Sequence, residues 1–123
     1  MDFTAIQARY LRDAPPIRLG GIAANLARIA SFSRNDANRE IVEHMINESK
    51  SFIEWAAPET DVDTAAVLVE LQLQLAQWQR GWAGIWEDTE KRRALIEQCR
   101  YWSKRVLDMS GLLREDPSCG KVA

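Results

Sequence analysis

Hydrophobic residues recur at intervals of three and four along most of the chain. The clearest stripe lies in the second half and consists of Leu68, Leu71, Leu75, Trp78, Trp82 and Ile85. Side chains with this spacing share one side of an α-helix, which makes one turn about every 3.6 residues. Almost no stretch shows the strict alternation of apolar and polar residues that is typical of a half-buried strand. The pattern therefore predicts an all-helical protein.

Helix-breaking and helix-capping residues divide this pattern into a short first segment and four long ones, each of about 17 to 25 residues. The pair Pro15-Pro16 separates the first segment from the second, because proline is tolerated in the first turn of a helix. Ser110-Gly111 can end the last helix, since glycine favours the backbone conformation that follows a helix C-terminus. Three further residues stand where N-caps are expected: Asp36, Asp61 and Asp88.

The other long segments carry stripes of the same kind. These are Leu19, Ile22, Leu26 and Ile29 in the second segment; Val42, Met45, Ser49, Phe52 and Ala56 in the third; and Leu95, Cys99, Trp102, Val106, Met109 and Leu113 in the fifth. Such stripes suit helices that pack side by side at about 20°, and short connections favour neighbours of opposite direction. We therefore expect an all-α, up-and-down antiparallel four-helix bundle with a short N-terminal helix. Residues 1–113 would form its single domain and residues 114–123 a flexible C-terminal tail.

Composition agrees with a folded globular domain. The 123 residues are 46% hydrophobic and 28% charged, which is ordinary for such a domain. No apolar run reaches the roughly 20 residues that cross a bilayer, and the first residues lack the apolar centre of a signal peptide. We therefore expect a cytoplasmic protein without a membrane partner.

Few residues are available for metal or nucleophilic chemistry. The chain has one histidine, His44, and two cysteines, Cys99 and Cys119. These are too few for a multi-histidine metal centre or a disulfide framework, and the cysteines lack metal-ligand spacing. Nucleophile elbows and phosphate-binding glycine loops are absent as well. The sequence therefore predicts neither a metal nor a cofactor, and it favours a non-enzymatic protein.

Charge is distributed unevenly along the chain. The net charge is +2 over residues 1–40, −8 over residues 41–90 and +4 over residues 91–123, which gives −2 in total. Such asymmetry can mark an interaction surface, although complementary charges on neighbouring helices would give the same pattern. The solvent face of the last helix sums to only +1 and allows i,i+4 ion pairs; it consists of Arg93, Glu97, Arg100, Lys104 and Asp108. We therefore do not expect a nucleic-acid partner.

Four tryptophans are the candidate binding residues: Trp78, Trp82, Trp86 and Trp102. The first three follow one another at intervals of four and extend the apolar stripe of the fourth segment. Gly81 and Gly84 lie between them and indicate either close approach of another backbone or a helix that loosens before its end. The tryptophans can be core packing, the wall of a pocket for a small apolar ligand, or a subunit interface, because tryptophan is enriched at binding hot spots. An exposed apolar patch would favour self-association as a homodimer.

A second candidate site consists of polar residues at the edge of the predicted core: Arg18, Asn25, His44 and Glu48. His44 and Glu48 are one helical turn apart in the third segment, and the other two residues have the matching position in the second. Opposite charges near a core edge normally pair, so we expect an Arg18–Glu48 bridge between the two helices. The alternative is a polar pocket in which His44 transfers protons.

Two features of the sequence resemble known proteins. The stretch "RNDANREIVEH" places His44 after Arg39 with four residues between them, which resembles the Arg-x4-6-His motif of the HEPN superfamily of helical bundles, some of which are ribonucleases. This resemblance implies that Arg39 binds the scissile phosphate and that His44 moves the proton. The runs "ESKSFIEWAAPE" and "IRLGGIAANLARIASFS" are similar to small uncharacterised helical proteins of cyanobacteria, which implies a bundle fold and no particular activity.

Two functions therefore remain open. The first is a non-enzymatic protein-interaction or assembly module, in its simplest form a homodimer held through helix faces and the tryptophan-bearing end. The second is a HEPN-like RNA-binding protein or ribonuclease that uses Arg39 and His44. The first function needs an exposed interface, and the second needs these two side chains at one site.

Overall fold

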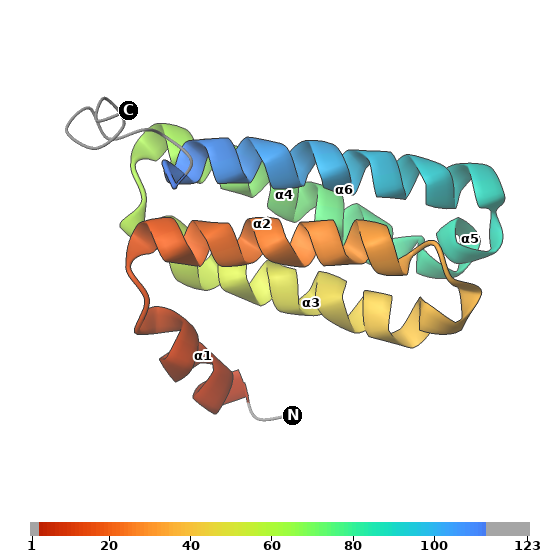
Figure 1. The fold of residues 1–123 in the computed structure, drawn as a ribbon, viewed down its shortest axis with the longest axis horizontal. Helices are drawn as coiled ribbons and strands as arrows, with labels where there is room; N and C mark the ends of the chain where they lie inside the picture. Colours follow the sequence, from red (N-terminus) through yellow and green to blue (C-terminus); the bar gives the residue numbers. More distant parts are fainter. Residues whose placement is uncertain (1–2, 113–123) are drawn as a thin grey trace, which may run out of the picture.

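The computed structural model describes residues 3–112 and shows helices joined by short connections, with no strand in that range (Figure 1). The predicted all-helical class is confirmed. The predicted tail at residues 114–123, Leu113 of the last apolar stripe and Cys119 lie outside the described residues.

Two short and four long α-helices follow one another along the chain, with two 3-10 turns between them. Their bounds are α1 Phe3–Leu11, α2 Pro15–Phe32, α3 Arg39–Ala56, α4 Val62–Arg80, α5 Trp82–Glu87 and α6 Thr89–Ser110 for the α-helices, and Asp36–Asn38 and Ala57–Glu59 for the 3-10 turns. The predicted start of the second helix at Pro15 is confirmed. Gly111, with a φ of 77°, follows the last helix in the left-handed conformation that glycine adopts without strain.

The long helices lie lengthwise beside one another (Figure 1). α2 packs along both α6 and α3, and α4 packs on α3. The pairing of α2 with α6 is the most extensive contact in the described chain. Small residues allow this close approach, since Ala23 and Ala30 are buried on α2 and the Ser103 hydroxyl on α6 donates a hydrogen bond to the Ala23 carbonyl at 2.7 Å. α1 rests on α3, and α5 rests on α6.

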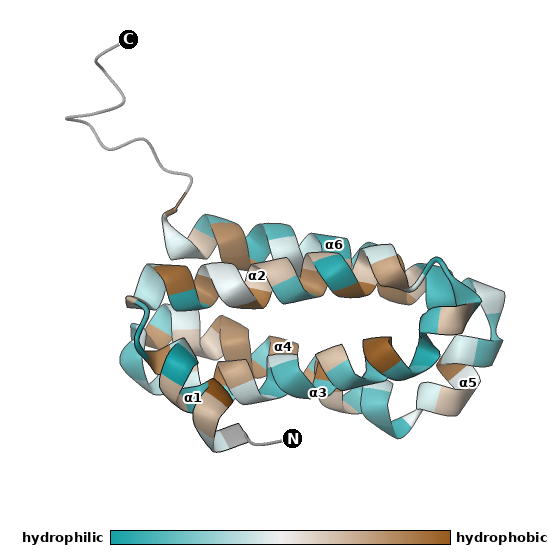
Figure 2. Ribbon diagram, turned by 60° about the horizontal axis from the view of Figure 1, so that its bottom comes forward, coloured by the Kyte–Doolittle hydropathy of each residue, from teal (hydrophilic) through white to brown (hydrophobic). Residues whose placement is uncertain are grey.

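The core is built from the apolar stripes that the sequence predicts. The following stripe residues are buried: Leu19, Ile22, Leu26, Ile29, Val42, Met45, Ser49, Ala56, Leu68, Leu71, Leu75, Trp78, Trp82, Leu95, Cys99, Trp102 and Val106. Phe52 is only partly buried. Its neighbours Ile46 and Ile53, which the predicted stripe of the third segment does not include, are more deeply buried than Phe52. Figure 2 shows hydrophobic and hydrophilic residues alternating around each long helix, as expected for helices with one side in a core.

Two of the three predicted N-caps are confirmed. The Asp61 carboxylate accepts a hydrogen bond from the Thr64 N–H at 2.7 Å. The Asp88 carboxylate accepts bonds from the first N–H groups of α6 at 2.9 and 3.1 Å. The prediction for Asp36 is wrong, because the chain makes a 3-10 turn before α3 begins. Asn35 caps that turn by accepting a hydrogen bond from the Ala37 N–H at 2.9 Å, which leaves the Asp36 side chain free for another contact.

The fourth predicted helix is two helices in the structure. We expected one helix to carry the stripe through Ile85, but α4 ends at Arg80 and α5 begins at Trp82. Gly81 terminates α4 with a φ of −99° and a ψ of 18°, and its N–H still bonds to the Gln77 carbonyl. Of the two interpretations of the glycine pair, the loosening of the helix is therefore confirmed.

Candidate functional site

The four candidate tryptophans are buried within the chain. Each has at most 7% of its surface exposed, and the rings of Trp82 and Trp86 lie 5.3 Å apart in a tilted arrangement. The indole N–H groups of Trp82 and Trp102 have no hydrogen-bond partner among the described residues. All four rings therefore belong to the core of the chain, and Trp86 also lines a surface pocket formed by described residues.

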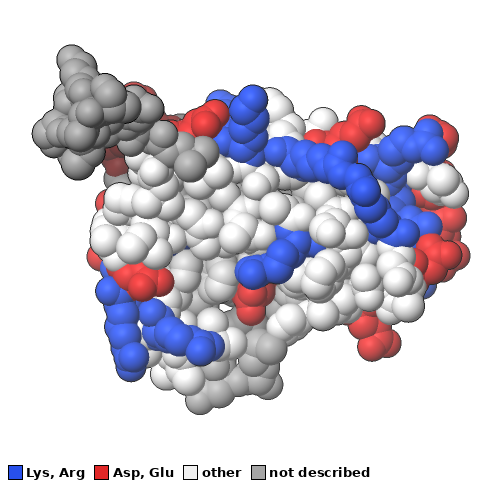
Figure 3. Space-filling model, viewed as in Figure 1, with Lys and Arg blue, Asp and Glu red and all other residues white. Residues whose placement is uncertain are grey.

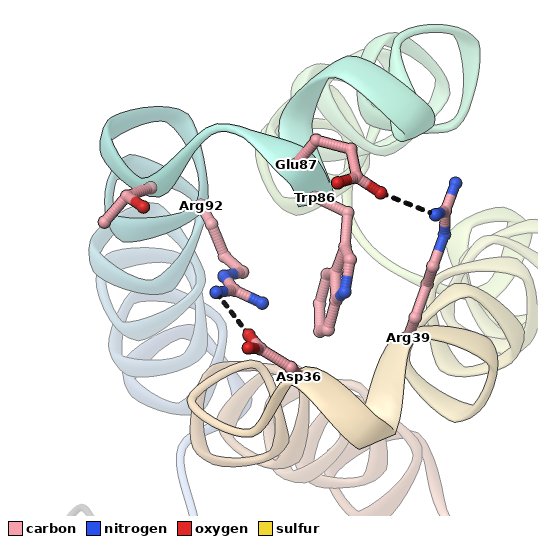
Figure 4. A pocket seen from close by; sticks show the side chains of 6 residues that line it. Asp36, Arg39, Trp86, Glu87 and Arg92 are labelled. Atoms are coloured by element: carbon pink, nitrogen blue, oxygen red, sulfur yellow. Dashed lines mark hydrogen bonds and ion pairs between the residues drawn. The ribbon is translucent and has the colours of Figure 1, made fainter.

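That pocket is a surface hollow of about 420 Å³ at the end of the molecule where α5 meets α6 (Figure 4). Its lining comes from the turn before α3 and from the starts and ends of three helices. The lining residues are Asp36, Arg39, Trp86, Glu87, Thr89 and Arg92. We call this hollow the end pocket.

Two ion pairs flank Trp86 in the end pocket. An amino group of Arg92 on α6 lies 2.6 Å from the Asp36 carboxylate, and the Arg92 guanidinium sits over the Trp86 ring at 4.7 Å from its centre. On the other side, Arg39 of α3 donates to the Glu87 carboxylate of α5 at 3.0 Å (Figure 4). A cation over an indole face is an attractive contact, so these pairs tie three separate parts of the chain together around one ring.

The chemistry of the end pocket is limited by its own charges. Each guanidinium faces a carboxylate, so the four charged side chains sum to zero. Both carboxylates are largely exposed, which places the ion pairs at the rim in contact with water, where such pairs are weak. The pocket contains no thiol and no imidazole. The arrangement can hold the helix ends in place.

The structure separates Arg39 from His44. Both lie on α3, but five residues of helix turn a side chain by about 140°, so the two point to different sides. Arg39 is engaged with Glu87 in the end pocket, whereas His44 is half-buried farther along α3. This geometry does not support the shared phosphate site that the HEPN resemblance implies.

The four polar residues predicted at the core edge do not form one cluster. Asn25 donates to the Glu48 carboxylate at 3.0 Å and to the Ser49 hydroxyl at 3.3 Å, which joins α2 to α3. Arg28 in turn donates to the Asn25 amide oxygen. His44 has no hydrogen bond to this group among the described side chains. The group is therefore a structural link between helices.

The predicted Arg18–Glu48 bridge is wrong. Arg18 lies in the first turn of α2, next to the connection from α1, and its guanidinium donates to the carbonyls of Leu11 and Asp13 at 2.8 and 2.7 Å. It also forms an ion pair with Glu59, which follows α3. Because the carbonyls of the α1–α2 connection lie close to Arg18, its guanidinium binds them and makes no contact with Glu48.

Two buried titratable groups are held in their neutral forms. Burial raises the pKa of the Tyr10 hydroxyl, and the positive charge of Arg18 lowers it to a smaller extent; the hydroxyl donates to the Arg18 carbonyl at 2.7 Å. Burial also raises the pKa of the Cys99 thiol. A neutral buried thiol is a poor nucleophile, so Cys99 acts as a core residue.

A further apolar surface, not recognised from the sequence, lies on the outside of α4. Val62, Val69 and Leu73 are 84%, 55% and 61% exposed, and the exposed Ala66 stands between them. These four residues, here called the outer stripe of α4, repeat at steps of four, three and four, opposite the buried stripe of the same helix. The spacing of the outer stripe is visible in the sequence. The longer stripe of the same helix, Leu68, Leu71, Leu75 and Trp78, is more strongly apolar and alone was assigned to a helix face.

Comparisons with protein-family models, with curated proteins and with solved structures find no match. In residues 3–112, no helix has both the length and the apolar character that crossing a membrane requires. The same range contains no group of three or more histidine, cysteine, aspartate or glutamate side chains suited to a metal ion.

Proposed function

We propose that this chain is a non-enzymatic assembly module that forms a homodimer through the outer stripe of α4. In this proposal, α2, α3, α4 and α6 form an up-and-down antiparallel four-helix bundle. The outer side of α4 remains available for a partner. The observation that carries the proposal is the exposure of the outer stripe. Single exposed apolar residues are ordinary on protein surfaces, but an unbroken stripe with a heptad-like period is the pattern by which helices pair.

A second copy of the chain fits this stripe in the antiparallel direction. Pairing that sets Val69 of one copy opposite Leu73 of the other also sets Arg80 opposite Val62, between Asp61 and Asp63. The acidic start of α4 in one copy then meets the basic end of α4 in its partner. Arg80 and Asp63 have no ion-pair partner within the described part of one protomer, so both charges are available for such a contact. Antiparallel helices also align their dipoles favourably.

The neighbouring surface of α6 extends the proposed interface. Tyr101 is 53% exposed, and its hydroxyl lies 3.2 Å from the Arg105 guanidinium. Arg105 also reaches Glu70 of α4 at 3.8 Å, which places the exposed tyrosine close to the outer stripe. Tyrosine and arginine are enriched at the energetic centres of protein interfaces, so this pair adds contact area that one helix alone would not supply.

Sedimentation equilibrium over a range of protein concentrations tests the proposal. We expect wild type to shift reversibly from monomer to dimer, and Leu73→Glu to raise the dissociation constant by about tenfold or more, because it places a charge in the contact. Ile41→Glu is the matched control, since Ile41 is a similarly exposed aliphatic residue on α3. A wild-type protein that stays monomeric at the highest concentration, or a control that weakens the dimer equally, would overturn the proposal.

A further inference from the structure

A second surface, separate from the outer stripe of α4, runs along the contact of α2 with α6. Two hollows of about 330 and 440 Å³ lie there. Both are lined by Arg34 of the α2 end and Arg100 of α6, so they form one continuous groove. We call it the α2–α6 groove. It reaches the end pocket, because Thr89 and Arg92 line both.

The α2–α6 groove is strongly basic. Its charged lining consists of five cations and one acid: Arg34, Arg92, Arg93, Arg100, Lys104 and Glu97. Figure 3 shows lysine and arginine side chains in a nearly continuous band along the α6 edge of the molecule. The sequence pattern of α6 alone indicates a nearly neutral face. The structure adds Arg34 from the turn after α2 and leaves the acidic neighbour Asp108 outside the groove lining.

Three of these cations have no carboxylate partner in residues 3–112. Arg92 is paired with Asp36, and Arg93 with Glu90 at 3.4 Å. By contrast, Arg34, Arg100 and Lys104 are exposed and take part in none of the described ion pairs. Their charges are therefore available to an anionic ligand.

Between its charged residues, the α2–α6 groove is lined mostly by small side chains. The small members are Ala27, Ala30, Ser31, Ser33 and Ser103, and the larger apolar members are Ile96 and Leu107. On α6, Arg100 and Lys104 are separated by a rise of about 6 Å, and Arg93 and Arg100 by about 10.5 Å. The ligand is therefore recognised by charges repeated along a line.

We propose that the α2–α6 groove binds the phosphate backbone of a single-stranded nucleic acid. Positively charged grooves that follow one strand are the usual means of such binding. The cations of α6 lie along one helix and face a single arginine, Arg34, in the turn after α2, which suits one phosphate chain rather than the two chains of a duplex. No exposed aromatic ring lines the groove, so the binding is independent of base sequence and depends strongly on salt.

The test is fluorescence anisotropy with a labelled oligouridylate and oligothymidylate of about 12 nucleotides, within the site sizes of such grooves. We expect the logarithm of the affinity to fall with the logarithm of salt with a slope of about −2, because three free cations each neutralise one phosphate. Arg34→Gln combined with Arg100→Gln should weaken binding by about tenfold and reduce the slope to about −0.7.

Matched controls separate groove binding from general charge attraction. Arg9→Gln combined with Arg12→Gln removes the same charge from exposed positions on and after α1 and should leave the affinity within about twofold. Circular dichroism shows whether each variant keeps its helices. Equal losses in both double variants would overturn the proposal, as would absence of binding at low salt. Equally tight binding of labelled polyglutamate would overturn it in favour of an acidic protein partner.

The test is independent of the proposed homodimer. The outer stripe lies on α4, whereas the α2–α6 groove involves neither α4 nor α3. Leu73→Glu should therefore keep wild-type affinity for the oligonucleotides per chain even where it prevents dimerisation. If wild type binds and Leu73→Glu does not, the groove of one chain is not the binding site and the proposal fails.

Discussion

The two sides of α4 are built from the same kinds of residue and meet different surroundings. On the inner side, Leu71 and Leu75 have no exposed surface and contribute to the core. On the outer side, Leu73 and Val69 leave more than half of their surfaces exposed. Leu71 and Leu73 are only two positions apart, but this spacing turns the side chain by about 200° around the helix. Hydrophobic character alone therefore does not determine which side of a helix its own chain covers.

The difference separates a side of α4 that serves folding from a side that we propose for assembly. The inner stripe of α4 is covered by other parts of the same chain. The outer stripe has no such covering in residues 3–112, and its burial would require a partner. A residue on the inner stripe should therefore affect the free energy of unfolding, and a residue on the outer stripe should affect association.

The largest expected effect is a difference in the free energy of unfolding between two variants, each of which truncates one leucine on one side of α4. Leu71→Ala should lower the free energy of unfolding by about 2 to 5 kcal/mol, because it removes buried methyl groups and leaves a cavity. Leu73→Ala should change it by at most about 0.5 kcal/mol in the monomer, as is usual for an exposed position. Urea unfolding followed by circular dichroism, at a concentration that keeps the protein monomeric, measures both values.

Comparable losses for the two variants would contradict the assignment of inner and outer sides. They would mean that Leu73 is covered within one protomer and that the outer stripe is not a free surface. Repeating the measurement at high concentration sharpens the test, since association stabilises the folded state by mass action. Under those conditions Leu73→Ala should lose stability relative to wild type.

The sequence was sufficient for the elements and most of the core. Periodicity identified most of the buried residues of α2, α4 and α6, because the longest three–four stripe of each of these helices faces the core. Local chemistry identified the caps at Asp61 and Asp88, where the acceptor and the N–H groups are close neighbours in sequence. The cap prediction failed at Asp36, because a 3-10 turn precedes α3 there. The prediction of one long fourth helix failed at Gly81, because the apolar stripe continues where the helix ends.

The candidate sites were harder to predict, because they depend on contacts between distant segments. The Arg92–Asp36 pair and the Arg39–Glu87 pair join residues about 50 positions apart, and no local pattern identifies such partners. The same limitation applies to Arg34 and Arg100, which share a groove only because α2 packs on α6. Arg18 shows the reverse case, since nearby carbonyls compete with the long-range partner that the sequence suggested.

A smaller effect should reveal the direction of the proposed helix pairing. Arg80→Glu and Asp63→Arg should each weaken the dimer several-fold, because each places like charges together at the ends of the paired helices. The double variant should recover most of the wild-type dissociation constant in sedimentation equilibrium if the helices are antiparallel. Failure of the double variant to recover would rule out this orientation, while the Leu73→Glu result would still decide whether the outer stripe is the interface.

The smallest expected effect concerns the start of α4, where both stripes begin. Hydrogen bonds from Thr64 to the Asp61 carboxylate, first the backbone N–H and then the hydroxyl, hold the pKa of Asp61 below the ordinary aspartate value. A lowered pKa in the folded state means that this cap stabilises the protein above the unfolded pKa of about 3.9. That stability is lost as the pH falls through the folded pKa, when the carboxylate is protonated.

Asp61→Asn tests this contribution, because asparagine still accepts the capping hydrogen bond but does not titrate in this range. The difference in unfolding temperature between wild type and the variant should be constant above pH 5 and should narrow as the pH falls below about 4. Asp63→Asn is the control, since Asp63 lies in the same turn and does not cap the helix. If the two variants show the same dependence on pH, the acid sensitivity belongs to the general charge at the start of α4. If only Asp61→Asn changes the pH dependence of the unfolding temperature, the cap itself is the acid-sensitive group. Protonation of Asp61 should then loosen the first turn of α4 and withdraw Val62 from the proposed contact. The dimer should therefore weaken over the same range of pH.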